Sequence, residues 1–262
     1  MNCVIIGTGW LGMPLMENLT LSGYTVSGSK RTLTSSTEAE NQLFAYPSSS
    51  EATKSILNNA DVIVLAFPPN RSSIDRYASD CLEVCQHIQS SCKIILTSST
   101  SVYPANFELC LEDELDLSQF PDHSIALAEY SLRKAYGERL TVIRLAGLIG
   151  PNRHPVRNMS KSGKTYAGNG AINVIHQLDA VRLIAFVIQH AIWGETLNGC
   201  SPEHPLRGEY YTWMAHELGL SPPLFEELEN ESKVVNSEKS ISLGFTYLYP
   251  NPFDFPLESK EL

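Results

Sequence analysis

The chain has 262 residues, of which 43% are hydrophobic and 18% are charged, an ordinary composition for a globular protein with a large buried core. Its net charge of −10 argues against a nucleic-acid partner, because an acidic surface repels phosphate backbones. No apolar run approaches the roughly 18 residues of a membrane helix. We also expect no secretory signal, and none of the six cysteines forms a CxxC pair. We therefore expect a cytoplasmic protein with no membrane or metal site.

Strand and helix patterns alternate through the first 150 residues. Short apolar runs predict strands at 3–6, 24–27, 42–45, 61–66, 93–97 and 140–145. Amphipathic patterns predict helices from the first glycine cluster to Gly23, and at 51–59, 72–90 and 124–136. This alternation predicts an α/β fold with a Rossmann-type, doubly wound parallel sheet, which binds ligands at the carboxyl ends of its strands.

Beyond Gly150 and Pro151 the pattern becomes irregular and rich in proline. Helices are predicted at 179–192 and 208–218. We predict a Rossmann domain over 1–150, with a smaller substrate-side lobe over 151–262 packed on it.

A GxGxxG motif lies directly between the first strand and the first helix. Its residues are Gly7, Thr8, Gly9, Trp10, Leu11 and Gly12. In this context the first glycine permits a tight turn, the second lets the backbone approach a pyrophosphate, and the third lets the helix pack closely on the strand. The motif predicts a dinucleotide on the positive end of the helix. The alternative is a purely structural turn.

The turn after the second strand is basic. It reads Ser29, Lys30, Arg31 and Thr32, with no carboxylate before Glu38. NAD enzymes usually place an acidic residue here for the ribose 2′-hydroxyl, whereas cations and hydroxyls suit the 2′-phosphate of NADP. We therefore favour NADP, with NAD as the other candidate cofactor and a solvated surface turn as the alternative. The absence of a carboxylate also argues against a methyltransferase.

Two further strand ends should face the same ligand. Ala66, Phe67 and Pro68 end the strand at 61–66, and Thr97 and Ser98 begin a polar loop, TSSTSVYP, over 97–104. We expect all five residues beside the cofactor. A loop of Ser and Thr can also simply bond its own backbone.

Three motifs together resemble the extended short-chain dehydrogenase/reductase superfamily, and most closely its atypical YeeZ-like branch of the NAD(P)-dependent epimerase/dehydratase family. They are GTGWLG, TSSTSVYP and the segment IRLAGLIGPNRHP over 143–155, and the likeness covers nearly the whole chain. The resemblance implies that Ser99 is the catalytic hydroxyl and that Tyr103 lies at the substrate pocket. It also implies a Tyr–Lys acid/base pair, for which Tyr130 and Lys134 form a YxxxK match. An alternative alignment on Glu129 leaves that pair absent.

Arg144, Arg153 and His154 are candidate substrate contacts, with structural roles as the alternative. His176 and Asp179 are interpreted as packing and helix-capping residues. The leading hypothesis is an NADP-dependent oxidoreductase, or a nucleotide-sugar epimerase/dehydratase-like enzyme, acting on a small molecule as a monomer or homodimer. The alternative is a catalytically reduced dinucleotide-binding protein with a sensor or regulatory role.

Overall fold

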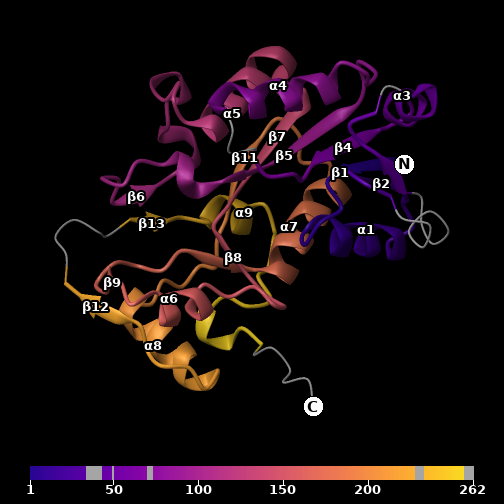
Figure 1. Ribbon diagram of the computed structural model, residues 1–262. Helices are drawn as coiled ribbons and strands as arrows, with labels where there is room; N and C mark the ends of the chain where they lie inside the picture. The colour runs from indigo at the N-terminus through magenta and orange to yellow at the C-terminus, as the bar shows by residue number, and fades with distance from the viewer. Residues whose placement is uncertain (34–42, 49, 70–72, 228–232, 257–262) are drawn as a thin grey trace. The chain divides into compact units, whose positions relative to one another are not determined.

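The computed structural model describes residues 1–33, 43–48, 50–69, 73–227 and 233–256 (Figure 1). The chain forms two compact units. Unit 1 comprises 1–102, 116–144 and 181–197, and unit 2 comprises 103–115, 145–180 and 198–262. Among the described residues, no helix is long and apolar enough to cross a membrane.

A seven-stranded sheet with the order β11-β7-β5-β4-β1-β2-β3 forms the centre of the fold. Its strands are β1 (Asn2–Ile6), β2 (Thr25–Lys30), β3 (Leu43–Ala45), β4 (Val62–Leu65), β5 (Lys93–Ser99), β7 (Leu140–Leu145) and β11 (Thr196–Gly199). The strands run parallel, as the register of β1 with β2 and β4 illustrates. The predicted Rossmann-type fold is confirmed, and the order reverses between β1 and β4, which is where such sheets bind ligands.

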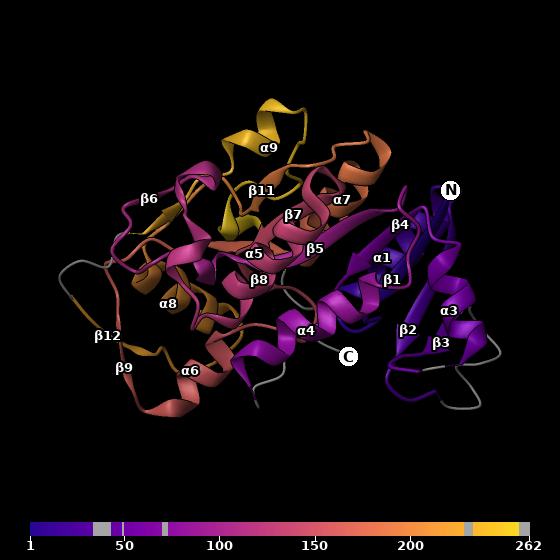
Figure 2. The same ribbon diagram turned by 90° about the horizontal axis from the view of Figure 1, so that it is seen from above.

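Helices cover both faces of this sheet. On one face lie α3 (Glu51–Asn58), α4 (Ile74–Cys85) and α5 (Ser124–Tyr136), and α1 (Gly12–Leu21) and α7 (Gln177–Gln189) lie on the other (Figure 1). Helices α4 and α5 pack side by side (Figure 2). Apolar stripes explain this arrangement: Leu15 and Leu19 of α1 and Cys81 of α4 are fully buried.

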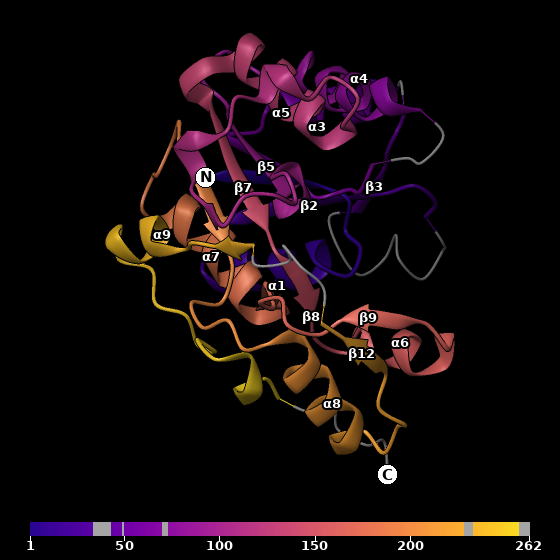
Figure 3. The ribbon, with the colours of Figure 1, turned by 90° about the vertical axis from the view of Figure 1, so that its left-hand side faces the viewer.

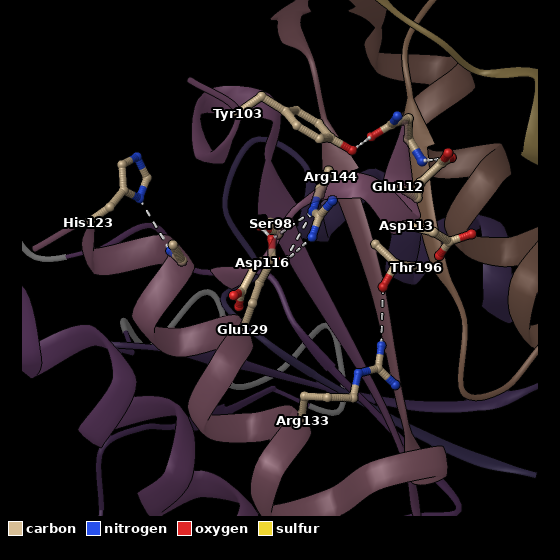
Figure 4. A network of polar contacts seen from close by, with 12 residues as sticks. Ser98, Tyr103, Glu112, Asp113, Asp116, His123, Glu129, Arg133, Arg144 and Thr196 are labelled. Atoms are coloured by element: carbon tan, nitrogen blue, oxygen red, sulfur yellow. Dashed lines mark hydrogen bonds and ion pairs between the residues drawn. The ribbon is translucent and has the colours of Figure 1, made fainter. Parts of the chain in front are cut away.

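Helix α5 is fixed at both ends. His123 caps its start, because its Nδ1 accepts the backbone N–H of Ala126 at 3.2 Å. Near its end, the Arg133 guanidinium donates to the Leu140 carbonyl at 2.6 Å and to the Thr196 hydroxyl at 3.2 Å (Figure 4). The helix is thereby joined to the beginnings of β7 and β11.

Unit 2 is built from short strand pairs and helices (Figure 3). Its parallel pairs are β8 (Gly147–Ile149) with β10 (Val174–His176), β9 (Thr165–Ala167) with β12 (Leu224–Glu226), and β6 (Leu109–Cys110) with β13 (Val234–Val235). Its helices include α6 (Val156–Ser162), α8 (Arg207–Glu217) and α9 (Glu238–Ser242). An aromatic core that includes Tyr210, Tyr211 and Phe255 holds this unit together.

Several predicted elements have different bounds, among them strands β2 and β5 and helix α4. Strand β2 extends to Lys30 because it pairs with β3 as well as with β1, so the basic segment begins inside the strand. Strand β5 extends to Ser99, so part of the predicted polar loop is strand. Helix α4 ends at Cys85; Ile88 is the one apolar residue in 86–90 and is only partly buried, so the apolar stripe of the helix does not continue. The predicted strand start Gln42 and helix start Ser72 lie outside the described residues.

Candidate functional site

Unit 1 contains a cavity of about 550 Å³ at the carboxyl edge of the sheet. Its walls come from the ends of β1, β2, β3 and β4 and from one face of α4. The lining residues are Ile6, Gly7, Thr8, Gly9, Ser29, Lys30, Arg31, Thr32, Tyr46, Pro47, Ala66, Phe67, Pro68, Arg76, Asp80 and Glu83. This size falls within the range of small-molecule and cofactor sites.

The three glycines of the motif differ in what the fold requires of them. Gly7 has φ +103°, and a Cβ there would lie 2.9 Å from the Ala66 carbonyl oxygen. A Cβ on Gly12 would overlap the carbonyl oxygen of Gly7. At Gly9, which lines the cavity, a Cβ would meet open space. Packing within the described residues therefore requires Gly7 and Gly12 but not Gly9, and a ligand approaching the backbone would require Gly9.

The glycine loop is attached to β2 through Ser29. The Gly7 N–H donates to Ser29 Oγ at 3.1 Å, and both the N–H and the hydroxyl of Thr8 donate to the Ser29 carbonyl, at 2.9 and 2.8 Å. Helix α1 then starts at Gly12 without a side-chain cap from any residue that the structure describes, and without an acidic residue in its first turn. Its positive end is thus available for an anion, which is the chemistry that holds a pyrophosphate.

Two walls of the cavity, the end of β2 and one face of α4, carry charged side chains. Lys30 and Arg31 lie at the end of β2, and from α4 come Arg76, Asp80 and Glu83. Arg76 Nε donates to Asp80 Oδ1 at 2.8 Å, one helical turn away.

Tyr46 and Pro47 complete this region from the end of β3. Burial, followed by the negative charge of Glu83, raises the pKa of Tyr46 to about 12, so its hydroxyl stays protonated and remains a donor.

The predicted cofactor-binding residues coincide only in part with the residues that line the cavity. Gly7, Thr8, Gly9, Ser29, Lys30, Arg31, Ala66, Phe67 and Pro68 line it, whereas Trp10, Leu11, Gly12, Thr97 and Ser98 are not among its lining residues. The lining residues that were not predicted are Ile6, Tyr46, Pro47, Arg76, Asp80 and Glu83. Two signals were present in the sequence: a proline two residues after the end of the third strand, and three charges spaced four and three apart on one helix face.

The hydroxyls of Thr97 and Ser98 both bond to neighbouring protein groups, Thr97 within the sheet and Ser98 to helix α5. Thr97 Oγ1 donates to the Leu65 carbonyl at 2.9 Å, and the buried Ser98 hydroxyl donates to Glu129 Oε1. Glu129 also pairs with Arg144, whose Nε lies 3.1 Å and whose Nη2 lies 2.9 Å from Glu129 Oε2 (Figure 4). The side chains of Arg144 and Glu129 are 3% and 1% exposed. This geometry favours the structural interpretation of Arg144 over substrate contact.

The two parts of the predicted catalytic set lie in different settings. Ser99 is the half-buried last residue of β5, and its Oγ accepts the Ser101 N–H at 3.1 Å. Tyr130 is 41% exposed and Lys134 is exposed, on the outer side of α5. The side of α5 that bonds to β5 carries Glu129 instead, one residue and about 100° around the helix from Tyr130.

The remaining predicted substrate residues lie in unit 2. Tyr103 is 2% exposed and donates its hydroxyl to Asn198 Oδ1 at 2.8 Å (Figure 4). His154 is 9% exposed, and its Nδ1 accepts the Val156 N–H at 3.2 Å. The ring proton therefore sits on Nε2, which lies 3.1 Å from the Tyr210 hydroxyl. Arg153 is exposed.

Comparison with known proteins agrees with this geometry. Residues 2–112 match the NAD binding domain of 6-phosphogluconate dehydrogenase. Protein YeeZ of Escherichia coli (strain K12) is 33% identical over 97% of this chain and 98% of its own length.

Two solved structures share the fold at low identity. UDP-glucuronic acid 4-epimerase from Bacillus cereus, in complex with NAD, has a TM-score of 0.72 and 19% identity, over 92% of each chain. The human epimerase family protein SDR39U1, with NADPH, has a TM-score of 0.69 and 15% identity, over 96% of each chain. The protein therefore shares its fold with these two epimerases. Its 33% identity to Protein YeeZ over nearly the full length of both chains shows that it belongs to the YeeZ family.

Proposed function

We propose that this protein binds NADP(H) in the unit 1 cavity and uses it in an oxidoreductase or epimerase/dehydratase-like reaction. The observation that carries the proposal is Gly9, which lines the cavity although no described neighbour requires a glycine there. A structural turn would need glycine only at Gly7 and Gly12. A pyrophosphate that contacts the loop backbone accounts for the glycine at position 9.

The preference for NADP over NAD rests on the charges at the end of β2. Lys30 and Arg31 line the cavity of a chain whose net charge is −10, so they provide a local positive site in an acidic protein. A 2′-phosphate carries roughly −1.5 to −2 charges near pH 7 and accepts charge-assisted hydrogen bonds. The ribose 2′-hydroxyl of NAD would gain no such bonds from these two side chains.

Ser99 is the residue that we propose to polarise the substrate oxygen. Its Oγ accepts the Ser101 N–H, which leaves its own O–H to donate to a carbonyl or carbinol oxygen. The nicotinamide, when bound, supplies or accepts the hydride in such reactions. The substrate that we favour is a small molecule, with a sugar nucleotide as the leading class, and the protein would act as a cytoplasmic monomer or homodimer.

The exposed positions of Tyr130 and Lys134 favour a second candidate function, a dinucleotide-binding protein with reduced catalysis and a sensor or regulatory role. A general base must lie within hydrogen-bond reach of the proton that it moves. Helix α5 presents Glu129, already paired with Arg144, on its β5 side, and presents Tyr130 on its outer side. The two candidates share the cavity and differ only in turnover.

Titration with NADPH and NADH tests the binding proposal. We expect NADPH to bind at least tenfold more tightly than NADH, a difference of about 1.4 kcal/mol, and Arg31→Ala to remove most of this preference. Lys54→Ala, which removes a half-exposed cation of α3 that is not among the cavity-lining residues, is the matched control. A preference for NADH, or equal NADPH affinity in Arg31→Ala, would overturn the choice of NADP.

Turnover separates the two candidates. The enzyme hypothesis predicts a change in NADPH absorbance at 340 nm with a member of a carbonyl and nucleotide-sugar panel, and its loss in Ser99→Ala. If NADPH binds but no panel member reacts, and a cellular function survives in both Ser99→Ala and Tyr130→Phe, the binding-protein candidate is favoured.

A further inference from the structure

The cavity has a third cation, Arg76, which lies 45 positions beyond Arg31 in the sequence. Arg76 lines the cavity from the first turn of α4, whereas Lys30 and Arg31 approach it from the end of β2. Arg76 is therefore not part of the basic segment on which the choice of NADP rests. Its side chain is 63% exposed, as expected of a group at an open cavity wall.

Asp80 fixes one end of the Arg76 guanidinium. The bond at 2.8 Å joins Arg76 Nε to Asp80 Oδ1, and among the described residues the two Nη groups have no hydrogen-bond partner. A guanidinium held by Nε retains four N–H donors in a planar fork. That fork suits the bidentate recognition of a phosphate, and holding it in advance reduces the side-chain entropy lost on binding.

The charges of the α4 wall depend on this pair. Besides Arg76, the wall carries Asp80 and Glu83. With Arg76 in place, the net charge of the wall is about −1, and without it the wall would present two uncompensated carboxylates to a bound anion. An arginine at this position therefore matters both as a donor and as the charge that masks Asp80.

We propose that Arg76, positioned by Asp80, is a second specificity-determining residue for the 2′-phosphate of the dinucleotide. The inference rests on the proposed function, because it assumes an adenine dinucleotide in this cavity. It goes beyond that function by assigning the phosphate to two segments of the chain, the end of β2 and the face of α4. Preference for NADP would then require both Arg31 and Arg76.

Binding of 2′,5′-ADP and 5′-AMP, measured by calorimetry on the full chain, isolates the phosphate from the rest of the cofactor. Arg76→Gln should weaken 2′,5′-ADP about tenfold, and 5′-AMP by less than roughly twofold, since a charge-assisted bond acts only on the ligand that carries the phosphate. Asp80→Asn combined with Arg76→Gln should recover part of the loss, because it removes the carboxylate that Arg76 no longer neutralises. Arg76→Lys should recover less than half of it, because lysine lacks the planar fork.

Lys54→Gln is the matched control, since Lys54 forms a comparable ion pair with Glu51 one turn apart on α3 and is not a cavity-lining residue. Equal weakening of both nucleotides in Arg76→Gln, or no weakening of either, would overturn the inference while NADPH binding to the unmodified protein still stands. If the unmodified protein binds neither NADPH nor 2′,5′-ADP, the proposed function itself fails.

Discussion

The buried pair of Glu129 and Arg144 gives the clearest stability prediction. Replacing Glu129 by glutamine changes almost no volume, but it removes the carboxylate that contacts Arg144 at 2.9, 3.1 and 3.3 Å and accepts the Ser98 hydroxyl. The amide nitrogen of glutamine would present donors where only acceptors fit. With side chains 1% and 3% exposed, water cannot replace the lost interaction.

The expected cost is about 3 kcal/mol, the lower end of the range for breaking a buried ion pair. For a protein of this size, that corresponds to a fall of roughly 10 °C in the melting temperature, measurable by circular dichroism. Glu51→Gln, which removes an exposed carboxylate paired with Lys54, should leave the melting temperature nearly unchanged, because exposed ion pairs contribute little to stability. Replacing Glu129 and Arg144 together by leucine and methionine should recover much of the loss. If Glu129→Gln melts within about 1 °C of the unmodified protein, the reasoning is refuted.

Three further results are expected. Gly12→Ala should lower the unfolding free energy by about 2 kcal/mol or more in a denaturant titration, because its Cβ would overlap the Gly7 carbonyl oxygen. Tyr103→Phe should cost about 1–2 kcal/mol in the same assay, because it removes the hydroxyl that donates to the buried Asn198 Oδ1; an unchanged midpoint would contradict this. Burial lowers the pKa of His176 below its ordinary value of 6.5, so as the pH falls the imidazole is protonated in the unfolded chain before it is protonated in the folded one. The contribution of His176 to the unfolding free energy should therefore be complete above pH 6.5 and decrease as the pH falls below 6.5. An unfolding free energy that does not change over this pH range would contradict the prediction.

Much of the sheet could be predicted because its strands are buried on both faces. An apolar run such as Val62–Leu65 strongly favours a strand over other elements, and the mainly apolar segment predicted as a strand at 140–145 has the observed bounds. The strand at Thr196–Gly199 was not predicted. Its residues show no periodic alternation of apolar and polar side chains, and the segment is a strand because it pairs with β7 at the edge of the sheet.

The glycine loop was the part of the site most open to prediction, because its signal lies in consecutive residues between one strand and one helix. The α4 wall was not, because Arg76 and Glu83 are distant in sequence from the motif, and only the sheet order brings α4 to the same edge. Side-chain environment was equally hidden. The sequence shows that Tyr103 and His154 have polar side chains. It does not show that each of these side chains forms a hydrogen bond with another side chain of unit 2.

His176 and Asp179 illustrate the opposite case, where an interpretation as structural residues agrees with the contacts. His176 Nδ1 accepts the Leu178 N–H at 3.2 Å at the start of α7. The Asp179 carboxylate accepts the backbone N–H groups of Leu248 and Tyr249, at 2.8 and 2.9 Å. A carboxylate so engaged anchors the chain near its end rather than acting on a substrate.

The most direct test of the central claim is NADPH binding to Gly9→Ala, measured by calorimetry with thermal unfolding of the same samples. Because a Cβ at Gly9 meets open space in the structure, we predict an unchanged melting temperature without ligand. We also predict at least about a tenfold loss of NADPH affinity, since the methyl group would occupy the position that the pyrophosphate needs. A Gly9→Ala variant that is folded and binds NADPH as tightly as the unmodified protein would contradict the assignment of this cavity to a dinucleotide.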